Sequence, residues 1–180
     1  RATPAVSLRQ SSFFLRFLTQ GPPAHVYDGA RLIPDLLLGG EGTAAAILFL
    51  VLSCVLIPMG MLARSSVNPP WGDRIAWVGL LAMGLFSSLF VLTVLRDALM
   101  LLLWLGNLAA GADLPWIALR RASAWTVIGL SLAGTLAGFY NARRRARVVD
   151  VDVPIAGLPQ DLDGFTIVQI SDIHVGPTIK

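Results

Sequence analysis

Two stretches of this sequence, residues 43–63 and 75–95, each contain 21 consecutive positions without a charged side chain. A helix rises roughly 1.5 Å per residue, so each stretch is long enough to span the roughly 30 Å hydrocarbon layer of a bilayer. Charged residues make up only 14% of the chain, whereas soluble domains carry about 25%. The sequence therefore predicts membrane-spanning helices rather than a soluble globular fold.

We place the membrane region at residues 43–142, with a third apolar helix at 122–141. Residues 98–105 are apolar but too short to cross alone, since a crossing takes about 20 residues. We expect them to extend the second helix from 95 to 105. Arg96 and Asp97 then follow the apolar core of that helix, and we expect them at the membrane interface.

Small residues in the last run predict a helix contact. Gly134 and Gly138 lie at positions i and i+4, a spacing that lets helix backbones approach closely in lipid. We expect this pair to pack within the bundle rather than to form a dimer. Cys54 is the single cysteine and lies inside an apolar run, so the sequence predicts neither a disulfide nor a cysteine metal site.

Residues 1–42 mix proline, glycine, serine and charged residues, and we expect a loop or a short amphipathic helix at the membrane interface there. Gly21, Pro22 and Pro23 are expected to end any helix that begins earlier in this segment. His25 follows them in the same proline-containing stretch, and we expect its side chain to be solvated.

The pattern changes after the arginine cluster at residues 143–147. Residues 148–155 alternate apolar and acidic side chains, which predicts a half-buried strand. Residues 165–170 are largely β-branched and apolar, which predicts a second, buried strand. We therefore expect the first strands of a water-soluble domain within residues 147–180. The sequence starts at Arg1 and stops just after these strands, so we expect both ends to be truncated.

Asp172 and His174 follow the second expected strand, with one residue between them. Because alternate residues of a strand point to the same side, their carboxylate and imidazole groups are expected to converge. Such a pair suits Zn, Mn or Fe. Taken alone, the spacing is explained more readily by a capping aspartate and a surface histidine in a turn.

The wider stretch from Leu158 to Thr178 resembles the opening of calcineurin-like metallophosphoesterases, and Gly138–Ala142 is also similar. More narrowly, the chain resembles the bacterial branch in which a multi-helix membrane region precedes the catalytic domain. The resemblance implies an α-helical membrane bundle followed by the first strands of an α/β metallophosphoesterase domain, a β-sandwich flanked by helices. It also implies a multi-pass protein of the bacterial inner membrane.

In that family, the residues that match Asp172 and His174 are ligands of the first metal of a dinuclear site. The resemblance thus implies two divalent ions (Mn, Fe or Zn) and hydrolysis of a phosphoester substrate. The family's later motifs, Gly-Asp, Gly-Asn-His and Gly-His-x-His, do not follow within this sequence. We expect the fragment alone to be inactive and the whole protein to be an enzyme. A catalytic domain so near a membrane helix makes lipid-linked phosphoesters a candidate substrate class.

A non-catalytic membrane sensor or transporter with a degenerate phosphoesterase-like tail is the alternative. Transporters usually carry intramembrane charges along a pathway, and the expected helix cores contain none. Nucleic-acid binding through residues 143–147 is a weaker alternative, because basic clusters beside a membrane helix normally set topology or meet lipid head groups.

Three crossings place the arginines near residues 64–74 and 143–147 on one side of the bilayer. Arg31, Arg96, Arg120 and Arg121 then lie on the other side. The positive-inside rule favours a cytoplasmic catalytic domain by a thin margin. Arg120 and Arg121 before an apolar helix faintly resemble a twin-arginine export signal, which would place that domain outside.

Overall fold

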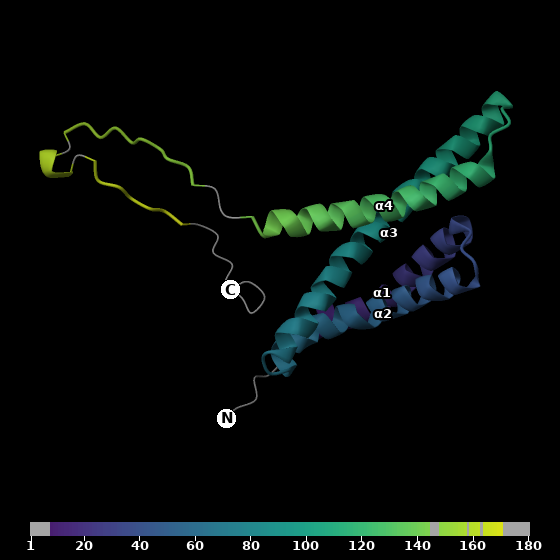
Figure 1. Cartoon of the computed structure of the whole chain (residues 1–180), viewed down its shortest axis with the longest axis horizontal. Helices are drawn as coiled ribbons and strands as arrows, with labels where there is room; N and C mark the ends of the chain where they lie inside the picture. Colours follow the sequence, from purple (N-terminus) through teal and green to yellow (C-terminus); the bar gives the residue numbers. More distant parts are fainter. Residues whose placement is uncertain (1–7, 145–147, 158, 163, 171–180) are drawn as a thin grey trace.

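The computed structural model describes residues 8–144, 148–157, 159–162 and 164–170. Four α-helices fill the first of these ranges: α1 Leu8–Leu36, α2 Gly40–Ser66, α3 Trp71–Ala110 and α4 Trp116–Ala142. Successive helices run back and forth, and α3 packs against each of the other three (Figure 1). Helix α1 also contacts all the others and lies between α2 and α4, which do not contact each other among the described residues.

Three of the helices are long and apolar enough to cross a membrane, over Gly40–Ala63, Trp71–Ala110 and Trp116–Ala142. The described residues thus contain helices of membrane length in each of the three places where the sequence predicts a span. Residues 98–105 continue α3, as expected, and the helix reaches Ala110. At roughly 1.5 Å per residue, α3 is about 60 Å long, roughly twice the hydrocarbon thickness. An upright crossing would leave one of its ends outside that layer.

Helix α1 occupies the segment where the sequence predicts a loop or a short amphipathic helix, and it does not end at Gly21, Pro22 and Pro23 as expected. The helix continues through three prolines, Pro22, Pro23 and Pro34. Prolines inside a helix destabilise it. The burial of Leu32 and Leu36 in the core with Leu89, Ala124 and Val127 stabilises α1 through contacts with other helices. The local helix-breaking signal does not report this tertiary packing.

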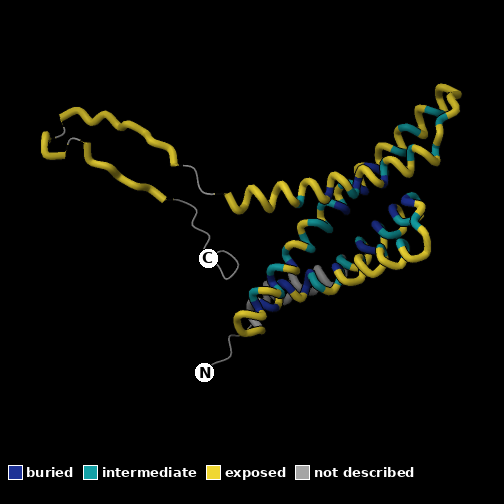
Figure 2. Tube along the Cα trace, viewed as in Figure 1, coloured by how far each residue is buried: buried dark blue, intermediate teal, exposed yellow. Residues whose placement is uncertain are grey.

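Residues 148–155 and 165–170 contain no strand, so the expected start of a sandwich domain is wrong for the part of the chain that the structure describes. A short 3-10 helix, η1 Gln160–Leu162, lies between them. Figure 2 shows both segments exposed, and Val148 and Ile167 are 85% and 81% accessible. A strand is stabilised by a hydrogen-bonded neighbour and a buried face. Neither is supplied by the described residues, so the described fold is all-helical.

Helices α2 and α3 cross in backbone contact at Gly60 and Gly79. A Cβ atom added to Gly79 would lie 2.5 Å from the Cα of Gly60 and 2.6 Å from the carbonyl oxygen of Leu56. The contact expected at Gly134 and Gly138 is not found, because no described atom lies within 4 Å of a Cβ built on either glycine. The close glycine contact of this bundle is therefore between α2 and α3.

We expect Gly79→Ala to lower the free energy of unfolding by about 1–3 kcal/mol, because the added methyl group forces the two backbones apart. Gly84→Ala is the matched control, since the same helix leaves open space around a Cβ at Gly84. Thermal unfolding of both variants in the same detergent measures the difference. Equal melting temperatures for the two variants would contradict the close crossing.

Candidate functional site

The predicted metal ligands, Asp172 and His174, lie outside the described residues. Within the described ranges, no group of three His, Cys, Asp or Glu side chains is arranged to hold a metal ion. Asp172 and His174 therefore stay predictions. The polar site that the structure does describe is a charged cluster where α1, α3 and α4 meet.

Arg96 and Asp97 lie within α3, which continues past them to Ala110 as the predicted extension requires. Their expected position at the membrane interface stays a prediction. The Arg96 side chain is only 4% exposed. A buried guanidinium is stable only when its donors are paired. The surrounding helices must therefore supply acceptors for it.

The guanidinium of Arg96 donates hydrogen bonds to both neighbouring helices. Its Nε donates to Ser123 Oγ of α4 at 2.8 Å, and one Nη donates to the carbonyl oxygen of Arg31 in α1 at 3.1 Å. The other Nη pairs with the carboxylate of Asp35 and donates to the carbonyl oxygen of Arg120 at 3.1 Å. Arg96 thus joins α1, α3 and α4 through one side chain.

Asp97 forms the second half of the cluster. Its Oδ2 accepts hydrogen bonds from Tyr27 Oη and from Arg31 Nε, both at 2.6 Å. Burial, followed by the hydrogen bond to Asp97, raises the pKa of Tyr27 to about 12. The Arg31 pKa is also raised, chiefly by its hydrogen bond to Asp97. Tyr27 therefore stays protonated, and Arg31 charged, at physiological pH.

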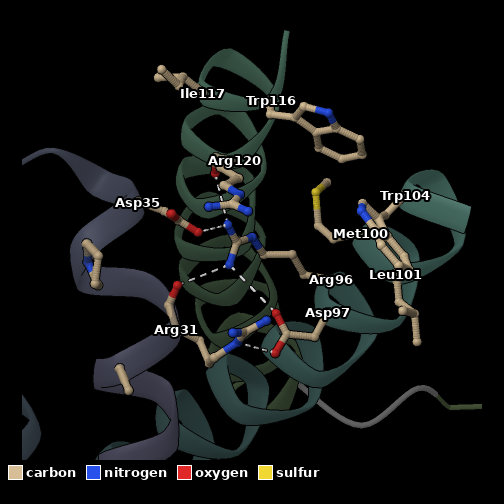
Figure 3. A pocket seen from close by; sticks show the side chains of 12 residues that line it. Arg31, Asp35, Arg96, Asp97, Met100, Leu101, Trp104, Trp116, Ile117 and Arg120 are labelled. Atoms are coloured by element: carbon tan, nitrogen blue, oxygen red, sulfur yellow. Dashed lines mark hydrogen bonds and ion pairs between the residues drawn. The ribbon is translucent and has the colours of Figure 1, made fainter. Parts of the chain in front are cut away.

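A pocket of about 660 Å³ opens beside this cluster. Figure 3 shows Arg96 at its centre, between Asp35 and Asp97, with Trp104 and Trp116 at one edge. The lining combines charged and apolar side chains: Ala30, Arg31, Pro34, Asp35, Arg96, Asp97, Met100, Leu101, Trp104, Trp116, Ile117 and Arg120. One wall is therefore suited to an anionic group and the other to hydrocarbon.

Two further polar residues of α1 are buried near this cluster. His25, expected to be solvated, is only 5% exposed and stacks on Phe86 with ring centroids 3.5 Å apart, so that expectation is wrong. Asp28 is 1% exposed, and neither of its oxygens has a hydrogen-bond partner among the described residues. The hydroxyl of Thr93 donates to the carbonyl oxygen of Leu89 instead. Burial raises the pKa of Asp28 to about 6.

The opposite end of the bundle carries arginines that stack on aromatic rings. Arg143 of α4 lies over the rings of Trp77 and Phe139, 5.0 and 5.1 Å from their centroids. Arg74 lies over Trp71, 4.9 Å from its centroid. The start of α3 and the end of α4 therefore share one end of the bundle, as three crossings require. Which end faces the cytoplasm stays a prediction.

Sequence reasoning missed this cluster because it ended any helix of this segment at Gly21, Pro22 and Pro23. Asp28, Arg31 and Asp35 are separated by three and four residues, the spacing of neighbours on one helix face. That spacing indicates a helix, but the prolines in the same segment, one of them between Arg31 and Asp35, indicate the opposite. The sequence shows that Arg96 and Asp97 of α3 are charged. Their ion-pair partners, Asp35 and Arg31, could be identified only once α1 was known to pack against α3.

Comparison with known proteins gives a partial match. No family model and no solved structure matches the chain. It is 45% identical over 56 residues to a protein of Danio rerio named "Transmembrane protein with metallophosphoesterase domain", a match that covers 30% of this chain and 13% of that protein. A Bos taurus protein of the same name is 34% identical over 93 residues, 51% of this chain and 20% of the relative.

The matches thus cover a fifth or less of each relative's length. Both relatives are vertebrate proteins, which leaves the narrower bacterial resemblance and the bacterial inner membrane as predictions. Three helices of membrane length, together with relatives named as transmembrane proteins, indicate a multi-pass membrane protein. The chain is similar to membrane proteins that carry a metallophosphoesterase domain.

Proposed function

We propose that this chain is the membrane region and the start of the catalytic domain of a metal-dependent phosphoester hydrolase. The similarity to two transmembrane proteins named for a metallophosphoesterase domain carries the proposal. The order of elements supports it, since three membrane-length helices precede the segment with Asp172 and His174. The membrane helices would then hold the catalytic domain at the bilayer surface.

In this proposal, the carboxylate of Asp172 and the imidazole of His174 hold one of two divalent ions. Oxygen and nitrogen donors of these types suit Zn, Mn or Fe. Bound divalent ions supply activation of water and neutralisation of charge on the phosphoryl oxygens. Asp172 contributes negative charge to the site, and His174 contributes a neutral nitrogen ligand.

One observation favours the alternative of a sensor or transporter module. Arg96 and Asp97 lie inside an apolar helix, and intramembrane charges often mark a transport pathway. However, Arg96 is held by four hydrogen bonds or ion pairs to α1 and α4. A charge fixed in this way anchors helices rather than lining a path, so we favour the enzyme.

Hydrolysis of bis-(p-nitrophenyl) phosphate by the full-length protein in detergent tests the proposal. We expect turnover to disappear when metals are removed with EDTA and to return when Mn²⁺ or Zn²⁺ is added. Mg²⁺ is the comparison ion, because it prefers an all-oxygen octahedral site and should restore less activity. Turnover that is unaffected by EDTA, or absent with every metal, would contradict the proposal.

A further inference from the structure

The pocket between α1, α3 and α4 has an excess of positive charge that the ion pairs do not consume. Its five charged residues are three arginines and two aspartates, which leaves one positive charge: Arg31, Asp35, Arg96, Asp97 and Arg120. Arg96 is buried and paired with Asp35, and Arg31 is paired with Asp97. The uncompensated charge is therefore that of Arg120.

Arg120 and Arg31 both have donors to offer a ligand. The ion pairs among the described residues do not include Arg120, whose side chain is exposed at the pocket edge. Arg31 donates only its Nε to Asp97, and its side chain is 52% exposed. Within the part of the chain that the structure describes, both of its Nη groups are therefore open to a ligand. Guanidinium groups present planar pairs of donors that match phosphate oxygens.

The other wall of the same pocket is apolar and exposed. Leu101, Trp104 and Ile117 are 55%, 51% and 76% accessible, although each lies in a helix of membrane character. Trp104 and Trp116 flank the opening, and tryptophan favours the interface between hydrocarbon and head groups. A ligand here meets charge on one side and hydrocarbon-like surface on the other.

The position of the pocket in the bundle agrees with head-group depth. Arg31 and Asp35 lie in the last turns of α1, a few residues before the span of α2 begins at Gly40. Arg120 lies in the first turns of α4, which begins at Trp116. The pocket is therefore beside the ends of two spans, where the polar groups of lipids lie.

We propose that this pocket binds an anionic phospholipid. The phosphate group contacts the guanidinium groups of Arg120 and Arg31, and an acyl chain lies along Leu101, Trp104 and Ile117. Arg96 is a positioning residue, since it holds α1 against α3 and α4 and thereby forms the charged wall. This inference concerns lipid binding and does not depend on hydrolysis by the catalytic domain.

Native mass spectrometry of the full-length protein in detergent tests the proposal, with dioleoyl phosphatidylglycerol and dioleoyl phosphatidylcholine as probes. We expect tighter binding of the anionic lipid, and Arg120→Gln should weaken that binding by about tenfold or more, because it removes a charge-assisted hydrogen bond to the phosphate group. Arg121→Gln is the matched control: it removes the same charge from the next residue, which does not line this pocket. Arg121 lines the adjoining recess, which shares Trp116 and Ile117 with the pocket.

Unchanged phosphatidylglycerol binding in Arg120→Gln would overturn the proposal, as would equal weakening in Arg121→Gln, which would reveal a general charge effect. A third arm uses sn-glycerol 3-phosphate to separate a lipid from a free phosphoester. We expect it to bind far more weakly than the lipid, because it makes no contact with the apolar wall. Equal affinity for the two ligands would show that the pocket takes a soluble phosphoester, and would contradict the lipid assignment.

Discussion

In the full-length protein, Asp172→Asn and His174→Ala are each expected to lower the turnover of bis-(p-nitrophenyl) phosphate by more than about a hundredfold. The reason is the proposed ligand role, because a change in a metal's outer shell alone costs about 10–100-fold and loss of a direct ligand costs more. The substitutions lie outside the membrane helices, so the amount of protein inserted in the membrane should not change.

Asp161→Asn is the control for these two variants. Asp161 is an exposed acidic residue of η1. Its substitution by asparagine removes one negative charge, as Asp172→Asn does, at a position before the proposed ligands. We expect this variant to retain the turnover of the wild type. Turnover near the wild-type value in Asp172→Asn or His174→Ala would remove the ligand assignment, and an equal loss in Asp161→Asn would point to a general effect of charge.

The second large effect is expected at Arg96. Arg96→Leu should lower the free energy of unfolding by about 3–5 kcal/mol, because it leaves the carboxylate of Asp35 and the carbonyl oxygens of Arg31 and Arg120 without their donor. Arg96→Lys keeps the charge but lacks the planar fork that reaches Ser123 and the two carbonyl oxygens, so we expect an intermediate loss. Unfolding monitored by circular dichroism in a single detergent measures both variants.

Arg121→Leu is the control for the Arg96 variants, since Arg121 is exposed on α4 and has no ion pair among the described residues. Its effect should stay within about 0.5 kcal/mol. A loss in Arg96→Leu no larger than that of the control would mean that the network does not hold α1 to the bundle. The proposed lipid pocket would then lose its charged wall as well.

The membrane helices could be predicted from the sequence because their signal is local. Uncharged runs such as residues 43–63 need only length and hydropathy, and the described helices follow them closely. The extension of α3 past Asp97 also followed from the apolar residues 98–105. In each case, the property that forms the helix belongs to the segment itself.

The predictions were wrong for segments whose structure depends on contacts with residues far away in the sequence. Helix α1 keeps Pro22 and Pro23 inside it because Leu32 and Leu36 pack against other helices, which no local rule reports. Conversely, residues 165–170 have the composition of a strand, but the described residues give them no neighbour to pair with. The buried place of His25 on Phe86 likewise depends on a contact between residues far apart in the sequence.

The charged cluster could not be predicted from the sequence for the same reason: its residues are partners that lie far apart in the chain. Arg96 and Asp97 were evident as charges beside apolar residues, and their position just after the apolar core of the second predicted helix suggested the membrane interface. Their partners Tyr27, Arg31 and Asp35 come from α1, roughly 60–70 positions earlier in the sequence. Only the packing of α1 on α3 turns these separate charges into one pocket.

The metal content of the purified full-length protein tests the central claim most directly. Elemental analysis of the wild type should find close to two divalent ions per chain, as a dinuclear phosphoesterase site requires, and Asp172→Asn should hold fewer. A wild-type protein that carries no Zn, Mn or Fe after purification and after incubation with each metal would contradict the account. The same protein would then be a membrane module with an inactive phosphoesterase-like segment.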